Sequence, residues 1–180
     1  MIDKINRAVE KEAFEINYYA DRKRNTVGYV LRFLWVLRKC HSSRGFSHFF
    51  YHLVWRRYMF KYGLEISDKC KIGKGLYIGH AFNITVNANA EIGDWCNIHK
   101  GVTIGQTNRG KKGSPKIGNM VWIGVNATIV GNIVIGDDVL IAPNSYVNID
   151  VPSHSVVLGN PCEIHHRKNA TEGYINNIPC

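Results

Sequence analysis

From Ile66 onward, an aliphatic residue returns every six positions with few exceptions. The series comprises Ile66, Ile72, Ile78, Ile84, Ile92, Ile98, Ile104, Ile117, Ile123, Ile129, Ile135, Ile141 and Val147. A period of six fits neither an amphipathic helix nor one alternating strand, but it fits short strands separated by turns, each placing one aliphatic side chain inward. Many of these residues precede a glycine, which lets the chain turn and neighbouring coils approach. The pattern therefore predicts a parallel β-helix whose triangular coil uses three units, with roughly four to five coils in all.

Two interruptions break the six-residue count. The stretch ITVNANAE, from Ile84, runs eight residues where six are expected, and the loop GQTNRGKKGSPK separates Ile104 from Ile117. Both are expected to be insertions into an otherwise regular array.

Residues 1–62 follow another pattern. INRAVEKEAFEINYYADRK spaces its apolar residues as a helix does, and the next two stretches are aromatic-rich and basic. We expect two or three helices packed beside the first coil. The predicted organisation is a helical segment at 1–62, a mainly β domain at 63–164 that closes with VPSHSVVLGNPCEI, and a mobile C-terminal tail at 165–180.

The formal net charge of +9 is concentrated in the helical segment. Residues 1–62 hold thirteen Lys and Arg against five Asp and Glu, a balance of +8, whereas residues 63–180 hold ten against nine, a balance of +1. Because the β domain is almost neutral, we expect no nucleic-acid partner. A basic and aromatic patch is expected to contact a membrane surface, or else to pack on the β-helix or another subunit with its charges in solvent. Its members are Trp55, Arg56, Arg57, Tyr58, Phe60 and Lys61.

The cysteines and the apolar stretches bear on the compartment. Five cysteines are an odd number, and none has CxxC spacing. This usage favours a reduced cytoplasmic setting, with the inner face of the membrane as a second location if the basic patch binds lipid. The most apolar stretch, Val27–Leu37, is interrupted by Arg32 and is too short to span a bilayer.

Several motifs within residues 63–164 resemble the serine acetyltransferase group of hexapeptide-repeat acyltransferases, including its sugar-modifying relatives. They are GLEISDKCKIGKGLYIGHAFNITVN, IHKGVTIG, PKIGNMVWIGVNATIVGNIVIGDDV and the ending GNPCEI, in which Cys162 stands at the usual alanine position. The resemblance implies a left-handed coil, a homotrimer, and acetyl-CoA bound in the groove between subunits. In that group a longer helical N-terminus joins trimers into hexamers, so the sequence leaves trimer and hexamer open.

Three residues are the catalytic candidates. His80 falls on the catalytic histidine of the resembling group, where a neutral imidazole takes a proton from the acceptor hydroxyl. Glu65 falls on the acidic partner that orients this histidine, although the group usually has aspartate. His99 is expected one coil further on, one position out of register with His80, and matches a histidine of the sugar-modifying relatives.

The predicted acceptor depends on residues that serine acetyltransferases use to bind serine and that this sequence lacks. The resemblance places Gly79 where serine acetyltransferases carry a serine-binding aspartate, and Gly113 and Ser114 where they carry Arg and His that engage the amino acid. We therefore expect a sugar hydroxyl in cell-surface polysaccharide assembly, with serine O-acetylation as the alternative.

Acetyl-CoA is expected to run along stacked turns where small residues allow close approach to the backbone. The candidates are Gly105, Gly124, Ala127, Ala142 and Pro143, with Lys116 and the loop cations Arg109, Lys111 and Lys112 available to its phosphates.

No metal site is predicted. His48 and His52 are spaced i, i+4, but Phe49 stands where a zinc-protease motif needs Glu, so packing is the better interpretation. A carbonic anhydrase-like hydratase, with His80 and His99 as zinc ligands, and a non-catalytic scaffold remain as alternatives from other classes.

Overall fold

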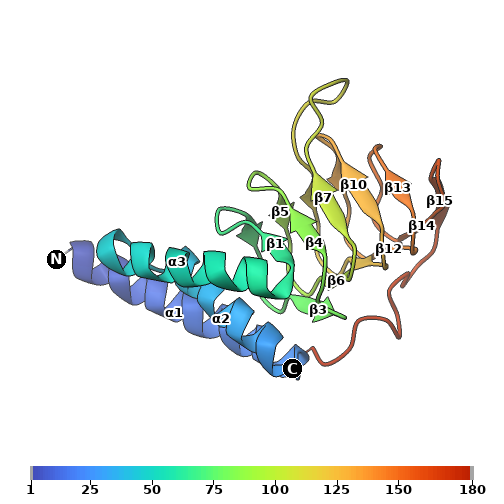
Figure 1. Cartoon of the computed structure of the whole chain (residues 1–180). Helices are drawn as coiled ribbons and strands as arrows, with labels where there is room; N and C mark the ends of the chain where they lie inside the picture. Colours follow the sequence, from blue (N-terminus) through green and yellow to red (C-terminus); the bar gives the residue numbers. More distant parts are fainter. Residues whose placement is uncertain (1, 179–180) are drawn as a thin grey trace.

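The computed structural model describes residues 2–178, so Cys180 and the last part of the predicted tail lie outside the described residues. Three helices lie beside one end of a stack of short strands (Figure 1). The helices are α1 (Ile2–Arg24), α2 (Gly28–His41) and α3 (Gly45–Tyr62). Among the described residues, none of these helices is both long and apolar enough to traverse a bilayer.

The strands form the three faces of a prism. Sheet A orders its strands β1-β4-β7-β10-β13, sheet B β11-β8-β5-β2, and sheet C β15-β14-β12-β9-β6-β3. Every neighbouring pair is parallel except β14 with β15. The bounds are β1 Leu64–Ile66, β2 Lys71–Ile72, β3 Tyr77–Gly79, β4 Ile84–Val86, β5 Glu91–Ile92, β6 Asn97–His99, β7 Thr103–Gly105, β8 Lys116–Ile117, β9 Trp122–Ile123, β10 Thr128–Val130, β11 Val134–Ile135, β12 Val139–Ile141, β13 Tyr146–Val147, β14 Ser155–Leu158 and β15 Glu163–His166. The predicted left-handed parallel β-helix with a short N-terminal helical segment is confirmed.

The repeated aliphatic side chains form three buried columns inside the prism. In sheet B, for example, Ile72 pairs with Ile92, which pairs with Ile117, which pairs with Ile135. Each of the four is at most 8% exposed. Because every coil adds one aliphatic residue to each column, burial of apolar surface is renewed coil by coil and stabilises the stack.

One of the two insertions lies elsewhere than the sequence count suggested. Val86, not Ile84, continues the column of sheet A, because Ile66 pairs with Val86 and Val86 pairs with Ile104. The eight-residue unit therefore falls between Ile78 and Val86, and its extra residues widen the corner that leads from β3 to β4. Ile84 is also buried and pairs with Leu64, which is why the sequence pattern did not distinguish the two registers.

Polar side chains of the helices form hydrogen bonds with unpaired backbone groups at the open end of the β-helix. A first coil has no preceding coil, so some of its backbone groups lack strand partners. Asn25 accepts a hydrogen bond from Ile78 N at 3.0 Å and donates to Leu76 O at 2.8 Å. Arg38 donates to Ile72 O at 2.6 Å, and its guanidinium is paired with the buried carboxylate of Asp21 at 2.9 Å. The helical segment is thus an end cap of the solenoid.

The C-terminal segment contacts the β-helix and the helices at several points, which the sequence did not predict for residues 165–178. After the antiparallel β15, the chain runs back past sheet C toward the helices (Figure 1). Asp138 accepts hydrogen bonds from Thr171 N at 2.9 Å, Thr171 Oγ1 at 2.7 Å and Ala170 N at 3.0 Å. Further along, Arg24 donates to Asn176 O at 3.1 Å. The sequence missed this docking because Asp138 has an ordinary position in its hexad.

Candidate functional site

His80 lies on the widened corner that follows β3. It is exposed and adopts a left-handed backbone conformation with φ of 50°, as does Asn83 with φ of 53° at the other side of the same corner. A left-handed residue is uncommon outside glycine and turns the chain sharply. His80 is exposed at this corner, so its imidazole is accessible to a substrate.

His99 lies one coil above and one position before His80 in register. It pairs with Gly79, as the repeat count predicts, and its Nδ1 lies 2.8 Å from Ile123 O. Since a carbonyl only accepts, Nδ1 carries the proton and Nε2 keeps its lone pair. Burial lowers the pKa of His99 below its ordinary value; the hydrogen bond to Ile123 opposes this shift, and the electrostatic effect of the neighbouring His80 adds to it. The net shift favours the neutral form of the His99 imidazole beside His80.

The absence of a side chain at Gly79 is what makes room for His99. A Cβ built on Gly79 would lie 2.4 Å from Cδ2 and 2.7 Å from Nε2 of His99. Both distances are too short for any real side chain. Any side chain at position 79, aspartate included, would therefore require the His99 ring to move.

An aromatic and amide-lined cavity of about 220 Å³ adjoins His99. Its described lining comprises Arg24, Tyr77, Asn97, His99, Trp122, Tyr174, Asn176 and Asn177. The ring of Trp122 is centred 4.7 Å from that of His99, and Tyr174 lies 5.1 Å beyond Trp122. Sequence reasoning missed Trp122 and Tyr174, although Trp122 stands one coil above Asn97 in sheet C and its outward hexad position was readable from the repeat.

Glu65 lies on the other side of the His80 corner. It is an exposed residue of β1, pairs with Thr85, and faces a cavity that it shares with Phe60, Phe82 and Asn83. Among the described residues, no hydrogen bond joins Glu65 to His80, so the orienting role expected for Glu65 has no contact to support it.

The candidates for binding acetyl-CoA fall into two groups. Gly124 and Ala142 continue the outward position of Gly79 and His99 in sheet C, and Pro143 follows Ala142 at the corner above His80. Gly105 ends β7 and Lys116 begins β8, so both lie at the corner between sheets A and B. Ala127 is fully buried inside the prism and presents no side chain to a ligand. Within one chain, only Gly124, Ala142 and Pro143 accompany His80.

The inserted loop between β7 and β8 also leaves from the corner between sheets A and B. Thr107 and Gly113 form an antiparallel bridge across it, and Lys111 is paired with Asp150 at 2.6 Å. Ser114 is buried and donates a hydrogen bond from Oγ to Asn87 Oδ1 at 3.0 Å, so it faces the wall of the prism. The loop therefore belongs to a different edge of the chain from His80.

A group of three side chains that could ligate a metal lies between α3 and the turn that follows β1. Within the described part of the chain, His48, His52 and Asp68 each place one ligand atom within 4.8 Å of the others. His48 Nδ1 already lies 3.1 Å from Cys40 O, and His52 Nδ1 lies 2.6 Å from Asp68 Oδ2. His52 is thus held by a hydrogen bond to Asp68 rather than by apolar packing alone. His80 and His99 belong to no three-residue group of this kind among residues 2–178.

Part of the repeat matches a known protein family, and the chain is similar to curated serine acetyltransferases. Residues 114–148 match the family described as bacterial transferase hexapeptide (six repeats). The serine acetyltransferase of Helicobacter pylori strain ATCC 700392 / 26695 is 41% identical over 99 residues, which cover 54% of this chain and 58% of that protein. A serine acetyltransferase of Staphylococcus aureus strain Mu50 is 43% identical over 104 residues, which cover 57% of this chain and 48% of that protein. The chain thus spans about half the length of the curated relatives it matches.

Among solved structures, the soybean serine acetyltransferase complexed with serine has a TM-score of 0.72 at 28% identity, covering 87% of this chain and 69% of that chain. This likeness extends beyond the repeat into the helical segment, because residues 63–164 are a smaller share of the chain than the part covered. The predicted resemblance is thereby confirmed: residues 114–148 match the hexapeptide repeat, and the chain is similar to the serine acetyltransferase group.

Proposed function

We propose that the protein is an O-acetyltransferase that uses acetyl-CoA. The observation that carries the proposal is the pair of histidines at the widened corner, with the small residues Gly124 and Ala142 directly above His99 in the same column. Acetyl transfer to a hydroxyl requires a base next to the bound thioester. The small residues of sheet C leave room for the thioester to lie against the backbone while its carbonyl carbon faces the acceptor.

In this proposal His80 is the general base. Its imidazole takes the hydroxyl proton as the acceptor oxygen attacks the thioester carbonyl carbon, and the proton then passes to the sulfur when the C–S bond breaks. No bond to the protein forms. His99 acts beside it as a hydrogen-bond acceptor through Nε2, since its tautomer is fixed by Ile123. Glu65 is retained only as a residue to be tested.

Serine is the first candidate for the acceptor. Support comes from the curated relatives, which are named serine acetyltransferases, and from the soybean protein of similar fold, which was solved with serine. A small hydroxyl acceptor would also fit an open corner of this kind.

A sugar hydroxyl is the second candidate, and the geometry at Gly79 favours it. The His99 ring fills the space of a side chain at position 79, so no carboxylate is available there for the ammonium group of serine. Ser114 is turned inward to Asn87, and Gly113 offers no side chain. The cavity beside His99 adds Trp122 and Tyr174, whose faces suit the apolar face of a pyranose, with amide groups for its hydroxyls.

We further propose a homotrimer. The loop and Lys116 lie at a different edge of the prism from His80 within one chain, so they reach the His80 corner only in a neighbouring copy. A threefold assembly with the site between subunits would join the two groups of cofactor candidates.

The test is release of CoA thiol by the whole protein with acetyl-CoA and either L-serine or a panel of nucleotide sugars and oligosaccharides. His80→Ala is expected to lower kcat roughly 10²- to 10⁴-fold, the range for losing a general base. Glu65→Gln tests the dyad, and His165→Ala, at an exposed histidine of β15, is the matched control. Full activity in His80→Ala would overturn the mechanism. Turnover of serine and none of the sugars would reject the sugar acceptor, and the reverse result would reject serine.

A further inference from the structure

Helix α3 carries apolar side chains on two opposite sides. One side faces inward, where Trp55 is 7% exposed and donates from Nε1 to Ile66 O at 3.0 Å. The other side presents a second set to solvent, which we call the α3 stripe: Phe46, Phe49, Phe50, Leu53 and Phe60. Phe46 is 86% exposed and Phe60 is 75% exposed. The structure thus corrects the patch expected from the sequence, since Trp55 is part of the core and residues 46–53 extend the exposed surface.

The spacing of the α3 stripe is that of one helix face. Residues 46, 49, 50 and 53 stand at i, i+3, i+4 and i+7, so their side chains form a continuous strip. Scattered exposed apolar residues are ordinary on a protein surface, but a continuous row of aromatic side chains marks an interaction site. Something apolar is therefore expected to cover this face.

Cations outnumber acidic groups around the stripe, where the acidic groups are Glu10, which is paired with Arg44 at 2.6 Å, and Glu65, which shares a cavity with Phe60. From Arg22 to Leu64 the chain has ten Lys and Arg and not one Asp or Glu. Arg56, Arg57 and Lys61 are exposed and stand between Leu53 and Phe60 or directly after it on the same helix. A partner that covers the stripe must therefore bring negative charge together with an apolar surface.

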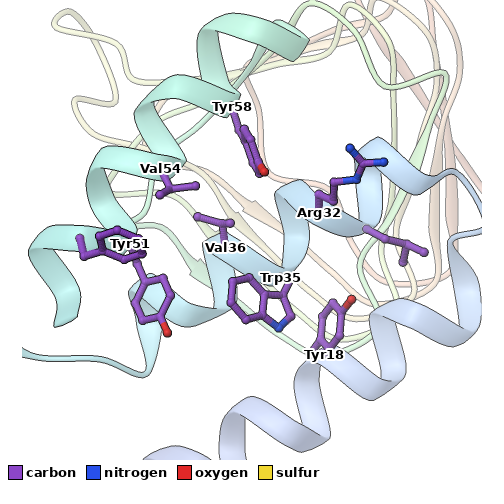
Figure 2. Close-up of a pocket in the computed structure, with 9 residues that line it drawn as sticks. Tyr18, Arg32, Trp35, Val36, Tyr51, Val54 and Tyr58 are labelled. Atoms are coloured by element: carbon purple, nitrogen blue, oxygen red, sulfur yellow. The ribbon is translucent and has the colours of Figure 1, made fainter.

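An apolar groove continues this surface between the helices. Figure 2 shows Tyr18 of α1, Arg32 and Trp35 of α2, and Tyr51, Val54 and Tyr58 of α3 around it. Its volume is about 430 Å³, and Arg32 is the one charged side chain among its described lining residues. Phe50 lines the groove and also belongs to the α3 stripe, so the two surfaces meet there.

We propose that the α3 stripe and the cations around it bind the surface of an anionic membrane. Aromatic side chains insert between lipid headgroups while Arg and Lys contact phosphates, which matches the chemistry of an interfacial helix. A second copy of the chain is a poorer occupant, because it would bring an equal positive charge to the same face. This inference does not depend on the proposed acetyl transfer.

The test is flotation of the full chain with vesicles of phosphatidylcholine alone and of phosphatidylcholine with phosphatidylglycerol. We expect binding to the anionic vesicles that weakens as salt is raised, and little binding to the neutral ones. Arg56→Gln with Arg57→Gln should weaken binding about thirtyfold, since each cation near an anionic surface contributes about 1 kcal/mol. Phe46→Ser with Phe49→Ser should weaken it more than about tenfold.

A matched control distinguishes binding through the α3 stripe from binding through the overall positive charge of the chain. Arg167→Gln with Lys168→Gln removes the same charge next to β15, at the far end of the β-helix, and should leave binding unchanged. Equal binding to neutral and anionic vesicles, or an equal loss in the Arg167/Lys168 variant, would overturn the proposal. So would the absence of binding together with a phenylalanine-dependent change in oligomeric state by sedimentation, which would assign the stripe to contacts between copies.

Discussion

The helical segment and the β-helix bury different kinds of groups. Inside the β-helix, stacked columns of isoleucine and valine repeat the same apolar contact in every coil. Where the helices meet the first coil, the buried residues include Asp21, Arg24, Asn25 and Arg38, which reach backbone groups. A solenoid is self-complementary along its length but not at its end, so the end needs side chains that replace the missing coil.

The two regions are therefore expected to tolerate substitutions differently. A coil in the middle of the stack can lose apolar area and keep its hydrogen bonds, because those join backbone to backbone. The cap depends on individual polar side chains, and each is buried without an alternative partner in water. The predictions below test this contrast, starting with the largest effect.

Replacing Arg38 with Met should have the largest effect on stability. The substitution leaves the Asp21 carboxylate buried without its guanidinium partner and frees two backbone carbonyls, at a cost of about 3–5 kcal/mol in the free energy of unfolding. Urea denaturation followed by circular dichroism measures it. Arg57→Met, at an exposed position of α3, should change the free energy by less than about 0.5 kcal/mol. The interpretation fails if the two variants are equally stable.

Replacing Asp138 with Asn should loosen the C-terminal segment by about 1–3 kcal/mol, because Asn accepts fewer of the bonds from Thr171 and Ala170. Burial alone would raise the pKa of Asp138, but hydrogen bonds from Thr171, His154 and Ala170 outweigh it and lower the pKa.

The sign of the pH dependence follows from this shift. The carboxylate stabilises the docked segment fully above its unfolded pKa of about 3.9, and the contribution is lost as pH falls through the lower folded value. The protection of the amides of residues 167–178 against hydrogen exchange, expressed relative to the intrinsic exchange rate at each pH, should therefore fall in the wild type as the solution is acidified below about pH 4. In Asp138→Asn this protection should already be low at pH 7. Identical protection in both proteins at pH 7 would contradict the role of Asp138.

The smallest effect concerns thiol reactivity. Burial raises the pKa of Cys40, Cys70 and Cys96 to about 12, so their thiolates are scarce at pH 8. Cys162 is only half-buried. In a Cys180→Ser background, an aromatic disulfide reagent should label one thiol rapidly, and Cys162→Ser should remove that signal. Rapid labelling of two or more thiols in the folded protein would show that the cap or the core opens readily.

Much of the fold was readable because it repeats. Twelve of the thirteen predicted aliphatic positions fall in the stacked columns, since each must fill the same space in successive coils; Ile84 is the exception. The prediction for Ile84 was wrong because Val86, two residues further on, is also apolar. Only the pairing of Val86 with Ile66 and Ile104 shows which of the two residues continues the column. The candidate site was harder, because His99 and Trp122 meet through stacking of separate coils and Tyr174 arrives from a segment that carries no repeat.

The sequence by itself determined the β-helix, the helical segment before it, the uneven charge and the neighbourhood of His80 and His99. These follow from periodicity, composition and register, which are local or regular properties of the chain. The three-dimensional structure was needed to show that the insertion widens the His80 corner, that no hydrogen bond joins Glu65 to His80 among the described residues, and that the C-terminal segment docks on Asp138. It also decided which side of α3 remains open. These features depend on contacts between segments that do not belong to the same repeat. The local sequence pattern is compatible with several such arrangements, and burial and individual hydrogen bonds determine which one forms.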